Sequence, residues 1–400
     1  MRVLVAMVVL LAACASPAAV EPTGTPRPST AASEISRPTP GATGPCDSPT
    51  IEPCLAASFG EEGALEFANA VVAWNGRFVA VGHHFDSPYT APSASGSPRV
   101  WSSSDGRRWV EQPLDLGTQD VSLVGLAPVS DGQLLLVGVV GVNAAYSELG
   151  APPARSAAWT ADDALTWREV DLGLPNGVVA NSFAFGPMGY ALSTGTQLWF
   201  SADGLGWSLA HDAPEEGGFH DIVAGDEGFV ARGYVSPSGG ALVLASGDGQ
   251  MWYEARSLPG GGPLDVTSLD GDWLALAFDA DFSTISVWWS ANGLDWTRTI
   301  DVNDLTGPDG PKAGRGMESG ITGGTLASAG RRAYLTLTWN HCCAQMPVNV
   351  GLWTSVDGAA WSPAALEGGL IQSVALRNNV AVLAGHIGRG ARAAFWIAEP

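Results

Sequence analysis

The side chains best able to do chemistry in this 400-residue chain are six histidines and a scattering of acids, arginines and tyrosines. Imidazole can bind a metal ion or accept a proton near neutral pH, and carboxylates and guanidinium groups hold polar ligands. None of these residues has catalytic spacing, because no Gly-x-Ser-x-Gly, phosphate-binding glycine loop or His-Glu-x-x-His segment occurs. The sequence therefore assigns no catalytic residue, and we expect no cofactor.

Binding residues can still be placed once the elements that carry them are known, and internal repeats supply those elements. Five segments read Ser-x-Asp/Asn-Gly-x-x-Trp, and a sixth, Thr160–Trp167, reads one residue longer. Successive motif tryptophans are 40 to 65 residues apart, which is typical of one four-stranded propeller blade plus variable loops. The predicted structural residues are Asp105, Asp162, Asp203, Asp248, Asn292 and Asp357, with Trp109, Trp167, Trp207, Trp252, Trp296 and Trp361. We interpret Asp-Gly as a tight hairpin turn and the tryptophans as packing between blades.

A second hairpin precedes each motif, and seven such hairpins occur. They turn at Asn75-Gly76, Asp131-Gly132, Met188-Gly189, Glu227-Gly228, Asp270-Gly271, Gly330-Arg331 and Asn378-Asn379. The seventh unit ends before its fourth strand, and Thr50–Ala57 is the natural donor of that strand. The sequence thus predicts an all-β fold, a seven-bladed propeller of four-stranded antiparallel blades closed by an N-terminal strand, although six blades remain an alternative.

The N-terminal sequence predicts a targeting signal. Arg2 precedes an apolar run, Val3–Leu11, that is too short to span a hydrocarbon layer of about 30 Å. Leu11-Ala12-Ala13-Cys14 resembles the bacterial lipobox, which implies lipidation of Cys14; an ordinary secretory signal is the alternative. We therefore predict a signal peptide over 1–13, a lipid-anchored tether rich in proline, serine and threonine over 14–45, and the propeller over 46–400. The protein is expected to be held on a cell membrane, facing outside the cytoplasm.

Four further cysteines fit an exported chain. Cys46, Cys54, Cys342 and Cys343 permit two disulfides in three connectivities, and the sequence does not choose among them. A zinc site at His341-Cys342-Cys343 is the alternative. Because thiols in an oxidising compartment are more often bridged, we expect no bound metal.

Charge excludes one class of partner. The chain has 19 basic and 40 acidic residues and a net charge of -21, which disfavours binding to the phosphate backbone of nucleic acids. We expect no nucleic-acid partner and a monomeric protein.

The Ser-x-Asp-Gly-x-x-Trp segments resemble the Asp-box, or BNR repeat, of sialidase-like β-propellers, over about residues 50–400. That resemblance implies the fold alone, because enzymes and non-catalytic propellers share the motif. Sialidases also use an Arg-Ile-Pro segment, which is absent here, and three arginines that hold a carboxylate, with a tyrosine nucleophile paired with a glutamate and an acid aspartate. Arginines that could line a substrate loop are Arg99, Arg155, Arg232, Arg315, Arg389 and Arg392.

The two faces of the predicted propeller differ. Both sets of tight turns lie on one face, and longer loops build the other. All six histidines are assigned to the long-loop face, where the candidate binding residues are His83, His84, Asp86, His220, Tyr234, Asp279, His341, His386 and Arg389. Loop length, a ligand or partner surface, and a metal site each explain this distribution. We predict a non-catalytic envelope lipoprotein that binds a protein, peptide or glycan there; the alternative is a sialidase-like glycoside hydrolase acting on extracellular glycans.

Overall fold

Strands make up most of the part of the chain that the structure, a computed structural model, describes. The described residues are 42–43, 46, 53–60, 65–85, 96–117, 120–129, 132–142, 153–175, 177–235, 240–256, 258, 262–279, 283–307, 312–313, 320–339, 348–366, 369–388 and 391–399. The chain divides into two units, Met1–Arg37 and Pro38–Pro400, and all described residues belong to the second. Within these ranges, no helix has the length and apolar character needed to cross a membrane.

Apolar alternation interrupted by turn residues produces seven blades, as predicted. From the innermost strand outward they are β3 (Leu65–Trp74), β4 (Arg77–Phe85), β5 (Ser97–Ser103) and β6 (Val110–Gln112) in blade 1; β7 (Val121–Pro128), β8 (Leu134–Val140), β9 (Arg155–Ala161) and β10 (Arg168–Val170) in blade 2; β11 (Ser182–Gly186), β12 (Gly189–Ser193), β13 (Gln197–Ser201) and β14 (Ser208–Asp212) in blade 3; and β15 (Gly217–Gly225), β16 (Gly228–Val235), β17 (Gly240–Ser246) and β18 (Tyr253–Glu254) in blade 4.

The remaining blades follow the same order. Blade 5 is β19 (Pro263–Leu269), β20 (Asp272–Phe278), β21 (Ile285–Ser290) and β22 (Thr297–Asp301); blade 6 is β24 (Gly320–Ala329), β25 (Arg332–Trp339), β26 (Val348–Ser355) and β27 (Ser362–Ala364); blade 7 is β28 (Gly369–Arg377), β29 (Val380–Ile387), β30 (Arg392–Ala398) and β2 (Cys54–Phe59). A short helix, α2 (Val302–Thr306), follows β22, and β23 (Lys312–Ala313) pairs in parallel with β24. All other pairings are antiparallel.

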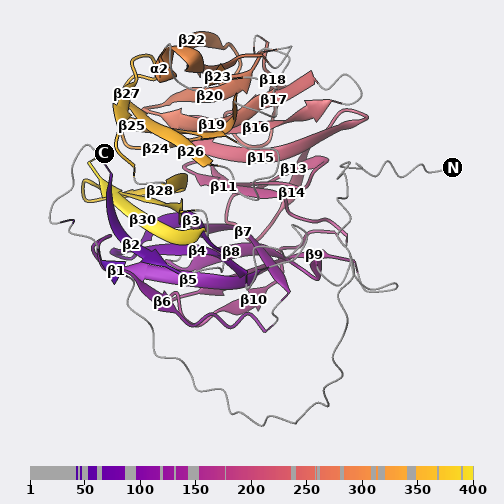
Figure 1. The fold of residues 1–400 in the computed structure, drawn as a ribbon. Helices are drawn as coiled ribbons and strands as arrows, with labels where there is room; N and C mark the ends of the chain where they lie inside the picture. The colour runs from indigo at the N-terminus through magenta and orange to yellow at the C-terminus, as the bar shows by residue number, and fades with distance from the viewer. Residues whose placement is uncertain are drawn as a thin grey trace, which may run out of the picture. The chain divides into compact units, whose positions relative to one another are not determined.

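The ring closes through the N-terminal strand. Strand β2 pairs with β30, with Cys54 opposite Ile397 and Phe59 opposite Ala393 (indigo and yellow in Figure 1). The prediction of an N-terminal donor strand is therefore confirmed. The strand spans Cys54–Phe59, so it overlaps the expected segment Thr50–Ala57 but ends two residues later. Strand β1 (Ala42–Thr43) extends this sheet and lies within the stretch that the sequence assigns to the tether.

The innermost strands form a ring that defines the two faces. Each first strand contacts the first strand of the next blade, and β28 contacts β3. In blades 1 to 6 the turns after the first and third strands lie at one end of the sheet, which we name the Asp-box face. In blade 7 the turn after β28 lies at the same end. The loops after the second and fourth strands lie at the other end, which we name the long-loop face.

Two kinds of turn build the Asp-box face. At Asn75-Gly76, Asp270-Gly271 and Asn378-Asn379, both central residues have positive φ, the geometry of tight hairpins. The Asp-box turns differ from the expected two-residue hairpin: β5 ends at Ser103, β6 begins at Val110, and of the Asp-Gly pair only Gly106 has positive φ.

Burial is concentrated between blades. Seven clusters of buried apolar residues lie among the described residues, and each joins the facing sides of two neighbouring blades, including blades 7 and 1. The blades thus stabilise one another by apolar contact rather than individually.

Candidate functional site

The Asp-box turns are held by a recurring set of hydrogen bonds. In blade 1, Asp105 Oδ1 accepts from the backbone N–H of Arg107 and Arg108 at 2.9 Å, and Ser103 Oγ accepts from the N–H of Gly106. The Trp109 indole N–H donates to the Gly106 carbonyl at 2.8 Å. The same bonds recur around Asp203, Asp248 and Asp357. Around Asn292, the two amide bonds and the tryptophan bond recur. The motif residues therefore act on the turn itself.

In blade 2 the motif aspartate is not the predicted Asp162. Asp163, not Asp162, accepts the two turn amides, from Leu165 and Thr166. Asp162 instead accepts from the Gln133 side chain at 2.6 Å. The motif therefore has the ordinary spacing from Asp163 to Trp167, and it is not one residue longer; Ala161 occupies the serine position.

Two features restrict the residue at the motif glycine position: its positive φ and the close packing of the neighbouring blade. Ala164 takes its place in blade 2 at a φ of 63°, in the left-handed region. In blade 4, a Cβ on Gly249 would lie 2.2 Å from the Phe200 ring of blade 3. Neighbouring blades thus pack directly on these turns.

The motif tryptophans pack against the preceding blade. The Trp109 ring stacks on Phe395 of blade 7, with centroids 3.9 Å apart and planes 10° apart. Trp167, Trp207, Trp252, Trp296 and Trp361 each belong to, or pack against, the apolar cluster that their blade shares with the blade before it. Their positions are those of core residues.

Several histidines lie in strands rather than in the expected loops. His83 and His84 are in β4, His211 in β14, His220 in β15 and His386 in β29. Burial lowers the pKa of His83 to about 4, and it lowers the pKa of His386 to about 4 as well. Two of the predicted binding residues are thus neutral and enclosed.

The strand register explains this burial. His83 continues the side of β4 that carries Val79 and Val81, which faces blade 2. Its Nε2 accepts from the backbone N–H of Leu123 in blade 2 at 2.8 Å, so the ring is the Nδ1-protonated tautomer. His386 likewise lies on the side of β29 that carries Val382 and Ala384 and faces blade 1. Its ring centroid is 4.9 Å from that of Phe67.

Of the other candidate binding residues, Asp279 binds its own loop, and several lie outside the described residues. The Asp279 carboxylate accepts from the backbone N–H of Ser283 at 2.8 Å and of Thr284 at 3.1 Å, so it holds its own loop. The predictions at Cys14, Asp86, Arg315, His341, Cys342, Cys343 and Arg389 lie outside the described residues.

A disulfide joins Cys46 to Cys54, with their Cα atoms 5.9 Å apart. It closes a short loop directly before β2, and the Cys46 carbonyl accepts from Arg107 Nε of blade 1 at 3.1 Å. This crosslink therefore fixes the closing strand beside the first Asp-box turn.

Two of the predicted residues do come together at the inner ring. His220 and Tyr234, on the paired strands β15 and β16, stack with centroids 5.0 Å and planes 26° apart. Both side chains are exposed, and His220 sits at a β-bulge between Phe219 and Asp221. The Asn181 amide of blade 3 donates to the Phe219 carbonyl beside it at 3.0 Å. We name Asn181, His220 and Tyr234 the platform.

A carboxylate–guanidinium cluster lies next to the platform. Arg232 Nη2 is 3.1 Å from Asp221 Oδ2 and 3.9 Å from Asp265 Oδ1. Ser182 Oγ donates to Asp221, and Asp265 Oδ2 accepts from the N–H of Leu326 at 2.8 Å. The cluster thus links the inner strands of blades 3 to 6.

Burial shifts the pKa of one group in this cluster and of one group beside it. Burial raises the pKa of Asp265 to about 6, against the lowering effect of Arg232. Burial and Arg232 also lower the pKa of His220, so that ring is neutral at pH 7. Sequence reasoning missed both aspartates, although each directly follows a bulge at the same place in consecutive repeats.

A second cluster was also missed. Glu66, at the start of β3, is 3% exposed, and its carboxyl oxygens lie 3.7 Å from Arg99 Nε and 4.0 Å from His84 Nδ1. Arg99 Nε is 3.2 Å from Glu111. Burial, and then the Glu111 charge, raise the pKa of Glu66 to about 7, while Arg99 opposes them. The available signal was an acid near the start of a largely apolar strand.

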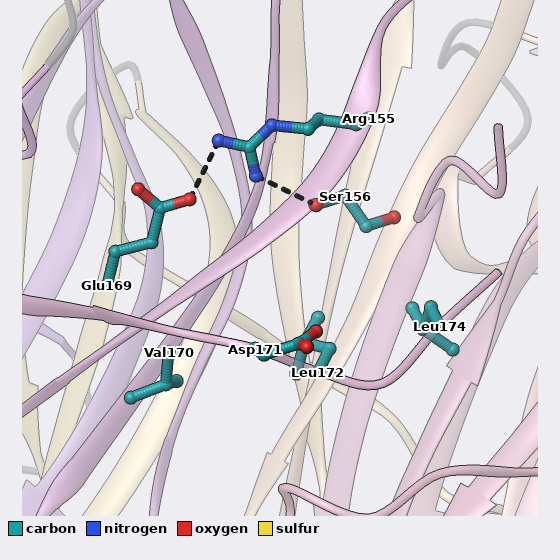
Figure 2. Close-up of a pocket in the computed structure, with 7 residues that line it drawn as sticks. All are labelled: Arg155, Ser156, Glu169, Val170, Asp171, Leu172 and Leu174. Carbon is teal, nitrogen blue, oxygen red and sulfur yellow. Dashed lines mark hydrogen bonds and ion pairs between the residues drawn. The ribbon is translucent and has the colours of Figure 1, made fainter. Parts of the chain in front are cut away.

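The groove shown in Figure 2 lies at the long-loop edge of blade 2. Arg155 reaches from β9 to Glu169 on β10 at 2.7 Å, and Asp171 accepts from the N–H of Gly173. Because the Arg155 and Glu169 side chains are about half exposed and already paired, this groove offers little binding energy. Arg99, Arg155 and Arg232 have separate partners and do not converge on one carboxylate site.

Within the described ranges, no group of three or more histidine, cysteine, aspartate or glutamate side chains could hold a metal ion. The arrangement is therefore one of aromatic, amide and paired carboxylate groups around the long-loop end of the inner ring.

Comparisons with known proteins bear on the fold. No protein-family model matches the chain, and no curated protein does. Among solved structures, the chain is similar to Trypanosoma rangeli sialidase in complex with the inhibitor DANA, at 11% identity and a TM-score of 0.43, covering 84% of this chain. The chain spans 55% of the length of that sialidase.

Two other similar structures are smaller. The β-propeller domain of the Trilobed protease from Pyrococcus furiosus gives 10% identity and a TM-score of 0.48 over 83% of this chain and 95% of that chain. Penicillium chrysogenum α-L-arabinanase gives 12% identity and a TM-score of 0.42 over 88% of this chain and 98% of that chain. At these values the likenesses carry no weight for a ligand or an activity, and the blade count rests on the sheet topology.

Proposed function

We propose that this protein is a non-catalytic, monomeric envelope lipoprotein whose propeller binds a glycan on its long-loop face, at the platform. The observation that carries the proposal is the exposed His220–Tyr234 stack beside Asn181. An aromatic surface takes the apolar face of a sugar ring, and neighbouring amide and imidazole groups bond its hydroxyls.

A glycan fits this place better than a protein surface does. Tyr234 is the one exposed large apolar side chain that the described residues place on the long-loop face. Protein interfaces are anchored by several buried aromatic or aliphatic side chains, whereas one ring with polar neighbours suits a sugar.

The location is proposed from the N-terminal sequence. The apolar run before Cys14 and the lipobox-like segment favour export and lipidation. The Cys46–Cys54 disulfide supports an oxidising compartment outside the cytoplasm.

A glycan array tests the ligand, followed by affinity measurement on the strongest glycan. We expect Tyr234→Ala to weaken binding at least tenfold and His220→Ala to weaken it by a smaller factor. Tyr253→Ala is the matched control, because Tyr253 is a similarly exposed tyrosine at the Asp-box end of β18. Equal loss in both tyrosine variants, or no glycan bound at all, would contradict the proposal.

A glycoside hydrolase is the second candidate, and the Asp221–Arg232–Asp265 cluster favours it. A carboxyl group with a raised pKa beside a second carboxyl group is the pattern of an acid and its partner. Turnover of any fluorogenic glycoside by the wild-type protein, abolished in a folded Asp265→Asn variant, would establish this function in place of the first.

A further inference from the structure

A cavity on the Asp-box face has no part in the proposed glycan site. It has a volume of about 320 Å³ and lies between blades 4 and 5. Its lining includes the buried rings of Phe229 and Trp273 and three exposed residues, Tyr253, Glu227 and Asn292. Three aromatic side chains and a carboxylate therefore surround one hollow.

The turns around this cavity are acidic. The four Asp-box-face turns of blades 4 and 5 contain Asp226, Glu227, Asp248, Asp270 and Asp295 and no basic residue. Arg331 of blade 6 pairs with Asp270 at 3.2 Å and offsets one charge. Glu227 is exposed, and no described residue forms an ion pair with it.

One of these acids is held in its ionised form by the fold. Asp248 accepts the N–H groups of Gln250 and Met251, and these bonds lower the pKa of Asp248. Asp248 thus keeps its negative charge at a lower pH than an ordinary aspartate does.

Exposed apolar side chains also occur in and beside the Asp-box turns of blades 3 and 4. Met251 is 60% exposed and Tyr253 is 55% exposed, and Leu205 and Leu209 are exposed on the neighbouring blade. These side chains give a partner segment apolar surface to pack on beside the acidic turns.

We propose that this cavity is a receptor site for an arginine side chain of a partner polypeptide, whose flanking apolar residues lie on Met251 and Leu205. A guanidinium group stacks on aromatic rings and pairs with a carboxylate, so Tyr253 and Glu227 supply complementary contacts. The acidic turns exclude an anionic partner, including a second copy of this chain presenting the same face. The site is separate from the platform and does not depend on it.

Blocked tripeptides test the site by ligand-observed NMR titration of the full-length protein. The probe is acetyl-Leu-Arg-Leu-amide, and its neutral match carries citrulline in place of arginine. We expect the arginine peptide to bind at least fivefold more tightly than the citrulline peptide. Glu227→Gln and Tyr253→Ala should each weaken its binding at least fivefold; both residues are exposed, so these variants are expected to fold.

Two controls separate this site from general charge attraction. Glu215→Gln removes one exposed acid from the loop between blades 3 and 4 on the opposite face, and it should leave binding unchanged. Tyr234→Ala should do the same, since it alters only the platform. Equal binding of the two peptides, wild-type affinity in Glu227→Gln, or equal loss in Glu215→Gln would overturn the proposal. A lysine peptide that binds as tightly as the arginine peptide would overturn the choice of guanidinium.

Discussion

Glu66→Gln is expected to change how the stability of the propeller depends on pH. The wild-type carboxyl group is protonated in both folded and unfolded chains below its ordinary pKa of 4.5. Between pH 4.5 and 7 the unfolded chain releases the proton first, because burial holds the pKa of Glu66 at about 7 in the folded protein. The stability that the protonated group contributes is thus lost as pH rises through this window.

The size of the effect follows from the two pKa values. At about 1.36 kcal/mol per pH unit, the difference between 4.5 and about 7 corresponds to an upper limit of about 3 kcal/mol. Glutamine has nearly the same shape and does not titrate. The free energy of unfolding of Glu66→Gln, relative to wild type, should therefore rise by up to about 3 kcal/mol between pH 4.5 and 8.

Urea denaturation of both proteins at several pH values measures this difference. Glu111→Gln is the informative control, because removing its charge lowers the pKa of Glu66 and should reduce the pH dependence only in part. If Glu66→Gln and wild type differ by the same free energy at pH 5 and at pH 8, the reasoning about this buried carboxyl is refuted.

Three further perturbations test other parts of the structure. Asp357→Ala should cost about 1–3 kcal/mol of unfolding free energy through the lost turn bonds, whereas Asp162→Ala should cost less than about 0.5 kcal/mol; equal costs in denaturation curves would contradict the assignment of the motif. Cys14→Ser should release the protein from the membrane fraction or leave it unprocessed, and a cleaved but membrane-bound variant would exclude lipid anchoring at this residue. Deleting residues 15–41 should leave the melting temperature unchanged, whereas deleting through Phe59 should lower it and cause association by exposing the edge of β30; matching melts would show that β2 does not close the ring.

The sequence predicted the fold well because repeats report local geometry. The Asn75-Gly76 turn and the alternation on both sides of it require a hairpin, and seven such hairpins with recurring motifs require a ring. The closing strand was predictable because the last blade lacked one. The Asp162 assignment failed because the motif was aligned on Thr160, although the spacing to Trp167 is preserved from Asp163.

The candidate site was less accessible to sequence reasoning. Whether His83 faces a core or a solvent-filled loop depends on how far β4 extends, and that length is set by pairing with β3 rather than by the local sequence. The Asp221–Arg232–Asp265 cluster joins residues of neighbouring blades, so the sequence of a single repeat does not reveal it. The approach of His220 to Tyr234 could have been inferred, once both were placed on paired strands.

Hydrogen–deuterium exchange of the full-length protein, with and without its strongest glycan, tests the central claim most directly. The proposed function predicts slower exchange in peptides from β15 and β16, which carry His220 and Tyr234, and unchanged exchange in the Asp-box turns. Protection confined to the Asp-box turns, or absent from β15 and β16, would contradict glycan binding at the platform.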